Sequence, residues 1–241
     1  MDYTWNRLNP TTIDNAPNHT MQLGHTFQWL LQAIAYANPS FGPINLLRIN
    51  LMDGYYCITL SSSGGLQMGI IMPMPDNCES LIPFPITLPM GWNTSPPFFC
   101  TFIEMAADLC HTCIHQPSCL PPHPMESQAN MHLPAHSASQ LHGLPPCAPP
   151  FNAQPPTKPL TLVDVYLNDF IGVDQTAPVM QHIQQTALHK ISDVFHSNDT
   201  SDMFCKQPIS QSKLAKGNAA WDTDKTILDW RMNTAMGTLH L

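Results

Sequence analysis

Charged side chains are scarce in this sequence. They make up 11% of its 241 residues, whereas about a quarter is usual for soluble globular proteins. Lysine and arginine together number nine, and the formal net charge is −8. A protein that grips nucleic acid usually neutralises several phosphates with lysine and arginine. The negative net charge and the small number of lysines and arginines therefore indicate either a chain that does not bind nucleic acid or a descendant of one that did.

Long apolar runs are also missing. No stretch reaches the roughly 20 apolar residues that span a bilayer. The N-terminus (MDYTW) lacks the basic and then apolar pattern of a secretion signal. We therefore expect an intracellular protein, cytoplasmic or nuclear, that is neither secreted nor bound in a membrane. In that compartment the eight cysteines are expected to be reduced thiols.

Proline is abundant and unevenly distributed. Twelve of the 25 prolines lie in residues 117–159, which also carry several histidines and almost no charge. Such a segment buries too little apolar surface to offset its ordering entropy, so we interpret it as a long loop or linker. The polar residues 1–22 are expected to be disordered. Residues 23–116 and 160–241 then form the two halves of one folded unit.

Hydrophobic spacing predicts the elements of those two halves. Helices are expected over residues 25–37, 98–114 and 177–195. Strands are expected over residues 44–51, 55–60, 227–232 and 237–241, and as a double strand over 160–173 with a turn at 167–169. Residues 61–65 favour a hairpin turn, and residues 81–92 favour an extended, proline-broken strand. This order favours an α+β fold whose sheet carries helices on one face.

Four stretches carry a family resemblance: residues 47–56 (LRINLMDGYY), 88–99 (LPMGWNTSPPFF), 165–171 (VYLNDFI) and 225–230 (KTILDW). In this order and spacing they resemble the palm domain of a reverse transcriptase, an RNA-directed DNA polymerase, from a eukaryotic retrotransposon. The second stretch is the most specific, because Pro-x-Gly-Trp followed by Ser-Pro is a rare combination. The resemblance covers residues 25–241 outside the linker.

The resemblance implies a polymerase palm, which is a ferredoxin-like antiparallel sheet backed by helices. The fingers are expected to be truncated and the thumb to be absent. The implied activity is RNA-directed DNA synthesis, a nucleotidyl transfer that uses Mg²⁺ and deoxynucleoside triphosphates on an RNA or DNA primer–template. Two metal ions about 4 Å apart would activate the primer hydroxyl and stabilise the leaving oxygen.

The resemblance also assigns site residues by position. The three metal-binding aspartates of the family correspond to Asn50, Asn168 and Asp169, of which only Asp169 keeps a carboxylate for metal. The nucleotide-binding positions correspond to Asp53, Tyr55, Met90 and Gly91. Core packing is an equally supported role for Tyr55, and it is the expected role of Trp92 and Phe98.

Two asparagines at metal positions predict a degenerate active site. Asparagine keeps one carbonyl oxygen but removes the charge, and magnesium prefers anionic oxygen ligands. Opposite charges about 4 Å apart are worth about 4 kcal/mol at an effective dielectric of about 20. Two lost carboxylates therefore remove roughly 4–8 kcal/mol, or about 10³- to 10⁶-fold in rate. We expect weak or absent metal binding and no polymerase activity; the alternative is a non-catalytic nucleic-acid-binding or structural remnant.

Other positions depart from the family or suggest different chemistry. Asp229 stands where the family usually has glycine. Asp164 lies four strand residues before Asn168, too far along the strand to replace the missing carboxylate. A separate zinc hypothesis concerns the cluster Cys110, Cys113, His115 and Cys119, whose residue types suit zinc but whose tight spacing disfavours a tetrahedral site.

Overall fold

Two three-stranded antiparallel sheets organise the computed structural model, which describes residues 23–72, 74–76, 78–116, 120–130, 156–195 and 207–241. The central sheet has the order β1-β3-β2, and the smaller sheet has the order β4-β5-β6. Their bounds are β1 (Asn45–Asn50), β2 (Thr161–Tyr166), β3 (Asp169–Asp174), β4 (Asp224–Ile227), β5 (Trp230–Asn233) and β6 (Thr238–His240). The mixed helix and sheet composition expected from the sequence is confirmed.

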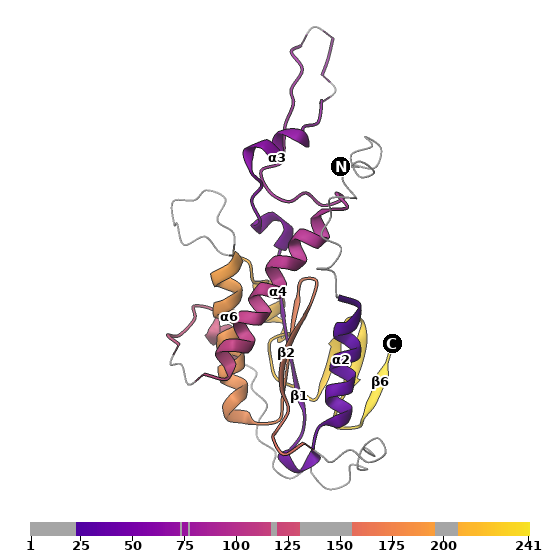
Figure 1. The fold of residues 1–241 in the computed structure, drawn as a ribbon, viewed down its shortest axis with the longest axis vertical. Coiled ribbons are helices and arrows are strands. Elements are labelled where there is room, and N and C mark those ends of the chain that lie inside the picture. The colour runs from indigo at the N-terminus through magenta and orange to yellow at the C-terminus, as the bar shows by residue number, and fades with distance from the viewer. Residues whose placement is uncertain (1–22, 73, 77, 117–119, 131–155, 196–206) are drawn as a thin grey trace.

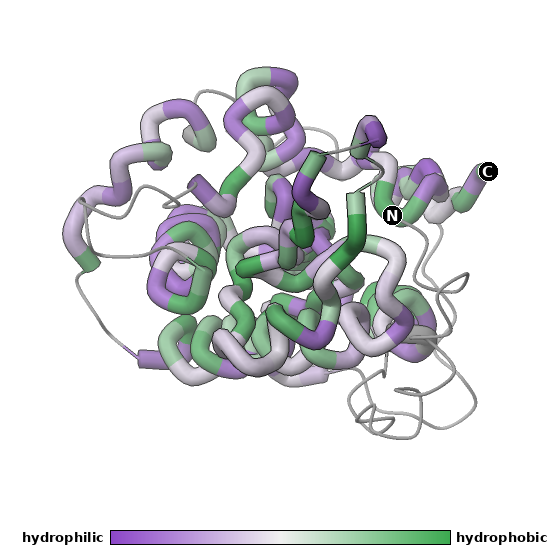
Figure 2. Tube along the Cα trace, turned by 90° about the horizontal axis from the view of Figure 1, so that it is seen from above, coloured by the Kyte–Doolittle hydropathy of each residue, from purple (hydrophilic) through white to green (hydrophobic). Residues whose placement is uncertain are grey.

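Three long helices accompany the sheets: α2 (Leu23–Tyr36), α4 (Ser95–Ile114) and α6 (Ala177–Phe195). They match the three predicted helices, and α4 begins three residues early because prolines are tolerated in a first helical turn. Hydrophobic and hydrophilic residues alternate along the helices, as expected for helices with one buried side (Figure 2). The short helices are η3 (Pro39–Phe41), η4 (Gly54–Cys57), α3 (Ser62–Gln67), α5 (Glu126–Asn130) and α7 (Gln211–Ala215).

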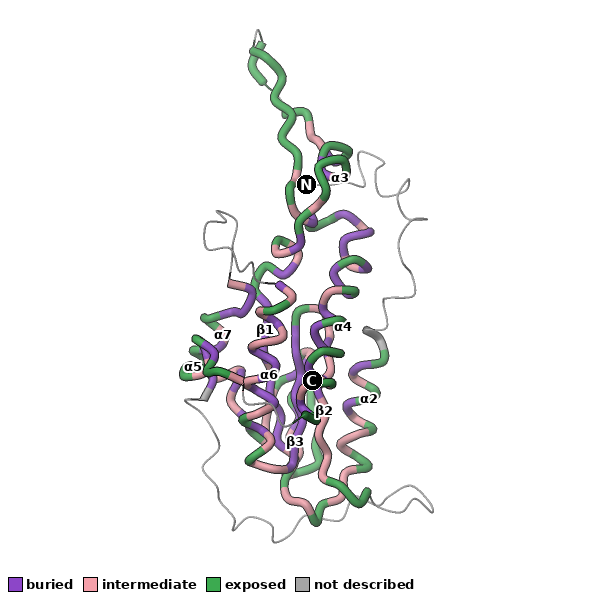
Figure 3. Tube along the Cα trace, turned by 60° about the vertical axis from the view of Figure 1, so that its left-hand side comes forward, coloured by how far each residue is buried: buried purple, intermediate pink, exposed green. Residues whose placement is uncertain are grey.

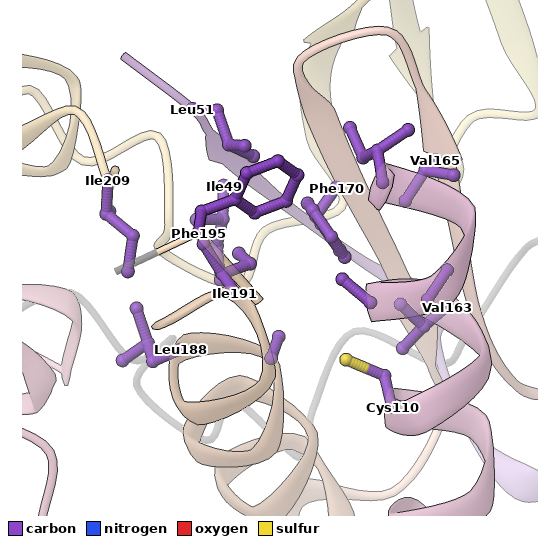
Figure 4. Packing of buried hydrophobic residues seen from close by; sticks show 14 of the residues in the cluster. Ile49, Leu51, Cys110, Val163, Val165, Phe170, Leu188, Ile191, Phe195 and Ile209 are labelled. Atoms are coloured by element: carbon purple, nitrogen blue, oxygen red, sulfur yellow. The ribbon is translucent and has the colours of Figure 1, made fainter. Parts of the chain in front are cut away.

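The central sheet is buried on both faces. One face packs against α4 and α6. Figure 4 shows Ile49 and Phe170 from the sheet beside Phe195 of α6, and Val163 beside Cys110 of α4. The other face carries residues such as Leu46 and Ile171, which pack against α2 and the smaller sheet (Figure 1). The expectation of helices on one face only is therefore wrong. All six residues of β3 are buried, so both of its faces need cover.

Residues 55–65 differ from the predicted strand and hairpin turn. Tyr55 lies in η4, and the only strand-like feature of this stretch is a single bridge between Thr59 and Thr87. The predicted turn is instead the start of α3, because the Ser61 hydroxyl accepts a hydrogen bond from the Gly64 amide and caps the helix. Local capping thus gives a helix at the position of the predicted turn.

A pair of extended stretches, residues 69–72 and 81–86, projects from the far end of α3 (Figure 3). The Ile70 and Met72 amides donate to the carbonyls of Pro83 and Leu81, each at 3.0 Å. Of the extended stretch expected over residues 81–92, residues 90 and 91 form a turn instead, and no regular strand forms in the rest. Prolines at 83 and 85 lack the amide hydrogen that a ladder needs.

Residues 120–130 pack against the folded unit, so the prediction of an unpacked loop is wrong there. Met125 and Ala129, one helical turn apart, are both buried beside α6. Gln184 of α6 donates to the Ala129 carbonyl at 3.0 Å. The prediction used the average composition of residues 117–159, in which proline dominates, and average composition does not reveal two individual apolar residues that pack. Residues 117–119 and 131–155, and the N-terminal 1–22, lie outside the described residues.

The smaller sheet contains a turn that the sequence did not predict. Ile227 pairs with Trp230, so residues 228 and 229 form a two-residue hairpin loop and split the predicted strand 227–232 in two. Leu228 (φ 52°) and Asp229 (φ 66°) are both left-handed, as in the hairpin turns that favour Asn-Gly. Asp229 therefore occupies a position where its side chain strains the backbone.

Replacing Asp229 with glycine is expected to stabilise the protein by about 0.5–1 kcal/mol, because glycine adopts positive φ without steric strain. Urea unfolding of the wild type and Asp229→Gly measures the change. Asp229→Ala is the matched control, since it removes the same carboxylate but keeps the Cβ atom; it should not stabilise. Equal gains in the two variants would show that charge, and not backbone strain, is responsible.

Candidate functional site

Asn50 and Asp169 are direct cross-strand neighbours at one end of the central sheet. Asn50 is the last residue of β1, Asp169 is the first residue of β3, and the two are register partners. Asn168 lies in the turn of the β2–β3 hairpin, which confirms the predicted hairpin, and its side chain is exposed. The Leu51 amide donates to the Asn168 carbonyl at 2.7 Å, which ties the end of β1 to the hairpin turn.

A hydrogen-bond network surrounds the Asp169 carboxylate. Asn50 Nδ2 donates to Asp169 Oδ1, and Arg48 Nη2 forms an ion pair with Asp169 Oδ2 at 2.8 Å. Asn218 Nδ2 in turn donates to Asn50 Oδ1 at 3.0 Å. Asn50 and Asp169 are only 2% and 5% exposed. The carboxylate is therefore enclosed by protein donors on both oxygens.

Arg48 reaches Asp169 because the two residues lie on the same face of the sheet. Arg48 precedes Asn50 by two residues in β1, and alternate residues of a strand share a face. Its Nη1 donates to the Thr226 carbonyl at 3.1 Å, and its backbone amide donates to the Asn218 carbonyl at 3.3 Å. Among the described residues its buried Nε has no hydrogen-bond partner. The guanidinium is thus held between the two sheets.

Burial and charge act in opposite directions on Asp169. Removal from water raises the pKa of this carboxyl group, whereas the neighbouring Arg48 and Lys213 lower the pKa and Asp229 raises it slightly further. An ionised carboxylate at this depth needs a compensating cation. Arg48 provides that cation directly.

The side chains present do not fit a pair of magnesium ions. Magnesium prefers anionic oxygens in octahedral geometry. Both oxygens of Asp169 and the side-chain oxygen of Asn50 already accept hydrogen bonds from the protein. Within the described part of the chain, no group of three or more His, Cys, Asp or Glu side chains is arranged to hold a metal ion.

Two of the proposed nucleotide-binding residues follow β1 directly. Asp53 is exposed in a left-handed conformation (φ 53°) at the start of η4. Tyr55 stacks on Phe99 of α4 with ring centroids 4.7 Å apart, and partial burial raises the pKa of its phenol. Gly54 permits this packing, because a Cβ atom there would lie 2.6 Å from the Phe99 ring. The contact favours core packing as the role of Tyr55.

The other two proposed nucleotide-binding residues, Met90 and Gly91, lie in the loop before α4. Met90 is 61% exposed, and Gly91 is left-handed at φ 91°. The Ser95 hydroxyl donates to the Pro89 carbonyl at 2.7 Å and holds this loop against the start of α4. Trp92 is buried as predicted, but its stacking partner Phe98 is 40% exposed, so the core role expected for Phe98 holds only in part.

Asp164 belongs to a different environment. It lines a cavity of about 510 Å³ between α2, α4 and β2. Glu104, Asp108 and His111 of α4 line the same cavity, as does Trp29 of α2. Burial raises the pKa of both Asp164 and Glu104. The position of Asp164 agrees with the expectation that it does not replace the missing carboxylates near Asp169.

The zinc hypothesis receives no support from the described residues. The Cys110 side chain is completely buried, and burial raises the pKa of its thiol to about 12. Zinc binds the thiolate, which such an environment disfavours. Cys113 is half-buried and His115 is exposed. Cys119 lies outside the described residues.

Sequence reasoning missed three residues around Asp169: Arg48, Asn218 and Lys213. Arg48 could have been found, because its spacing from Asn50 in a predicted strand places both on one face. Lys213 lies in α7 and Asn218 follows that helix, in a stretch where no helix or strand was predicted. No pattern in the sequence links these two residues to β1. Their proximity depends on the path of the chain after α6.

No protein-family model and no curated protein matches this chain. None of the helices among the described residues is both long enough and apolar enough to cross a lipid bilayer. The function is therefore inferred from the arrangement of the site residues.

Lys225 adds a second half-buried cation near Arg48. Its Nζ donates to the Ala220 carbonyl. Burial lowers the pKa of this amine to about 8; Asp222 opposes the change, and the positive charge of Arg48 adds to it. The folded protein thus binds the Lys225 proton less tightly than the unfolded chain does.

Replacing Lys225 with methionine should change how stability depends on pH. Between pH 8 and 10 the unfolded chain retains the lysine proton and the folded protein releases it, so the wild type gains stability as pH rises. Relative to Lys225→Met the gain is expected to be about 2 kcal/mol, measured by urea unfolding at both pH values. Lys216→Met, at an exposed lysine, should parallel the wild type. A constant difference between wild type and Lys225→Met would contradict the expected release of the proton.

Proposed function

We propose that this chain is a reverse-transcriptase-like palm domain of retroelement origin that no longer catalyses nucleotidyl transfer. The observation that supports the proposal is the cross-strand pairing of Asn50 with Asp169, beside Asn168 in the hairpin turn. These are the three positions where the resemblance expects metal-binding aspartates. The arrangement of a strand next to an antiparallel hairpin, backed by α4 and α6, suits that ancestry.

Loss of activity follows from the charge at those positions. Magnesium-dependent synthesis on a primer–template requires carboxylates that hold two cations near the primer hydroxyl and the incoming deoxynucleoside triphosphate. Here one carboxylate remains, and it is paired with Arg48 at 2.8 Å. Two neutral amides cannot replace the missing negative charge.

Primer extension tests this proposal. The wild-type chain should not extend a primer with Mg²⁺ or Mn²⁺. The revertant Asn50→Asp/Asn168→Asp should gain extension at high Mn²⁺ concentration, because it regains two of the three carboxylates. Adding Asp169→Ala to the revertant should abolish that gain. Extension by the wild-type chain that Asp169→Ala removes would contradict the proposed loss of catalysis.

A second candidate function is nucleic-acid binding without catalysis. The observation in its favour is the gathering of scarce cations near Asp169: Lys213 is close enough to lower the pKa of Asp169, and Lys225 interacts with Arg48. A local positive cluster can contact phosphates even on an acidic protein.

Fluorescence anisotropy with a labelled primer–template tests the binding function. Affinity should fall as salt concentration rises, because phosphate contacts release counterions. Lys213→Ala should weaken binding several-fold. Lys190→Ala is the matched control, since Lys190 lies on α6 and pairs with Asp193 at 2.7 Å. Equal losses in both variants would show that binding does not involve the Asp169 region.

A further inference from the structure

The orientation of Asn50 is determined by its two neighbours. Its amide nitrogen donates to Asp169, and its amide oxygen accepts from Asn218. A flipped amide would direct an oxygen at the carboxylate and an NH₂ group at the NH₂ group of Asn218. Since both contacts would then be repulsive, the network selects one orientation. In this orientation the only side-chain oxygen of Asn50 points away from the carboxylate with which it would share a metal ion.

Arg48 lies directly against the remaining carboxylate. Two nitrogens of its guanidinium are held, one by Asp169 Oδ2 and one by the Thr226 carbonyl. Its side chain is only 20% exposed. A divalent cation approaching Asp169 would have to displace this group or share the carboxylate with it at close range. Like charges at such a distance repel strongly in a partly buried site.

Arg48 stands out from the other arginine ion pair among the described residues. Arg231 pairs with Asp224 at the same distance of 2.8 Å, but its side chain is 65% exposed. The Arg231 pair is bidentate, through Nε and Nη2, but solvent and salt screen an exposed pair more than a buried one. Arg48 is instead anchored through its own backbone amide, through Thr226 and through Asp169. The two arginines therefore form a natural comparison of a buried and an exposed pair.

We propose that Arg48 is the resident counter-ion of Asp169 and that its guanidinium closes this site to divalent cations. Asn50 and Asn168 are neutral where the resemblance expects carboxylates. In addition, the Arg48 guanidinium competes with a metal ion for the one carboxylate that is present, that of Asp169. Restoring the carboxylates alone then leaves metal binding weak. The inference rests on the proposed function only in the choice of Asn50 and Asn168 as the positions to restore.

Mn²⁺ binding, measured by electron paramagnetic resonance on the full chain without nucleotide or nucleic acid, tests the proposal. The double variant Asn50→Asp/Asn168→Asp is compared with the same variant carrying Arg48→Gln. The triple variant should bind Mn²⁺ at least tenfold more tightly, because a neutral side chain no longer competes for Asp169. Adding Arg231→Gln to the double variant is the matched control and should leave the affinity unchanged.

Each outcome bears on Arg48 directly. Equal Mn²⁺ affinity in the double and triple variants would overturn the proposal, as would an equal gain from Arg231→Gln. Circular dichroism verifies that the variants fold. Should Arg48→Gln disrupt the fold, Arg48→Met keeps the aliphatic length without the charge and must show the same gain. Because no polymerase step is measured, a negative primer-extension result does not affect this test.

Discussion

The antiparallel register between β1 and β3 is the constraint on which the rest of the site depends. It sets Asn50 opposite Asp169 and Leu46 opposite Val173. Side chains alternate between the two faces of a strand, so a slip by one residue would move Asp169 into the apolar layer formed with α4 and α6. Both faces of the sheet are buried against different partners, and this burial specifies the register. Arg48 meets Asp169 only in this register.

Burying one carboxylate in a chain with few charges requires a dedicated partner. The partner of Asp169 is Arg48. The Asn50 amide donates to the second oxygen of Asp169, and the Asn218 amide donates to Asn50. The network joins β1, β3 and the chain after α7, and through Thr226 it reaches the smaller sheet. The polar contacts that would conflict with a metal pair therefore also connect the structural layers. The proposed loss of catalysis and a stabilising ion pair are compatible descriptions of the same residues.

Much of the secondary structure follows from sequence pattern. Helix α6 has the predicted bounds, and the β2–β3 hairpin forms where strand formers flank residues 167–169. The errors lie where local preferences compete. A serine cap converts the predicted turn at residues 61–65 into α3. Two apolar residues, Met125 just before α5 and Ala129 within it, pack a segment whose average composition favoured a loop. Secondary-structure propensity describes the average preference of a stretch, whereas a single helix cap or a single buried side chain can decide its conformation.

The sequence by itself determined the long helices, the hairpin and the neutral asparagines at positions 50 and 168, because periodicity and residue type are local properties. Only the tertiary structure decided what surrounds Asp169. Its partner Asn50 lies 119 positions away in the chain, and Asn218 lies 168 positions from Asn50. Hydrogen bonds and ion pairs between such distant residues depend on strand register and on the path of the chain. No local pattern encodes those two features, so the ion pair between Arg48 and Asp169 emerges only in the folded protein.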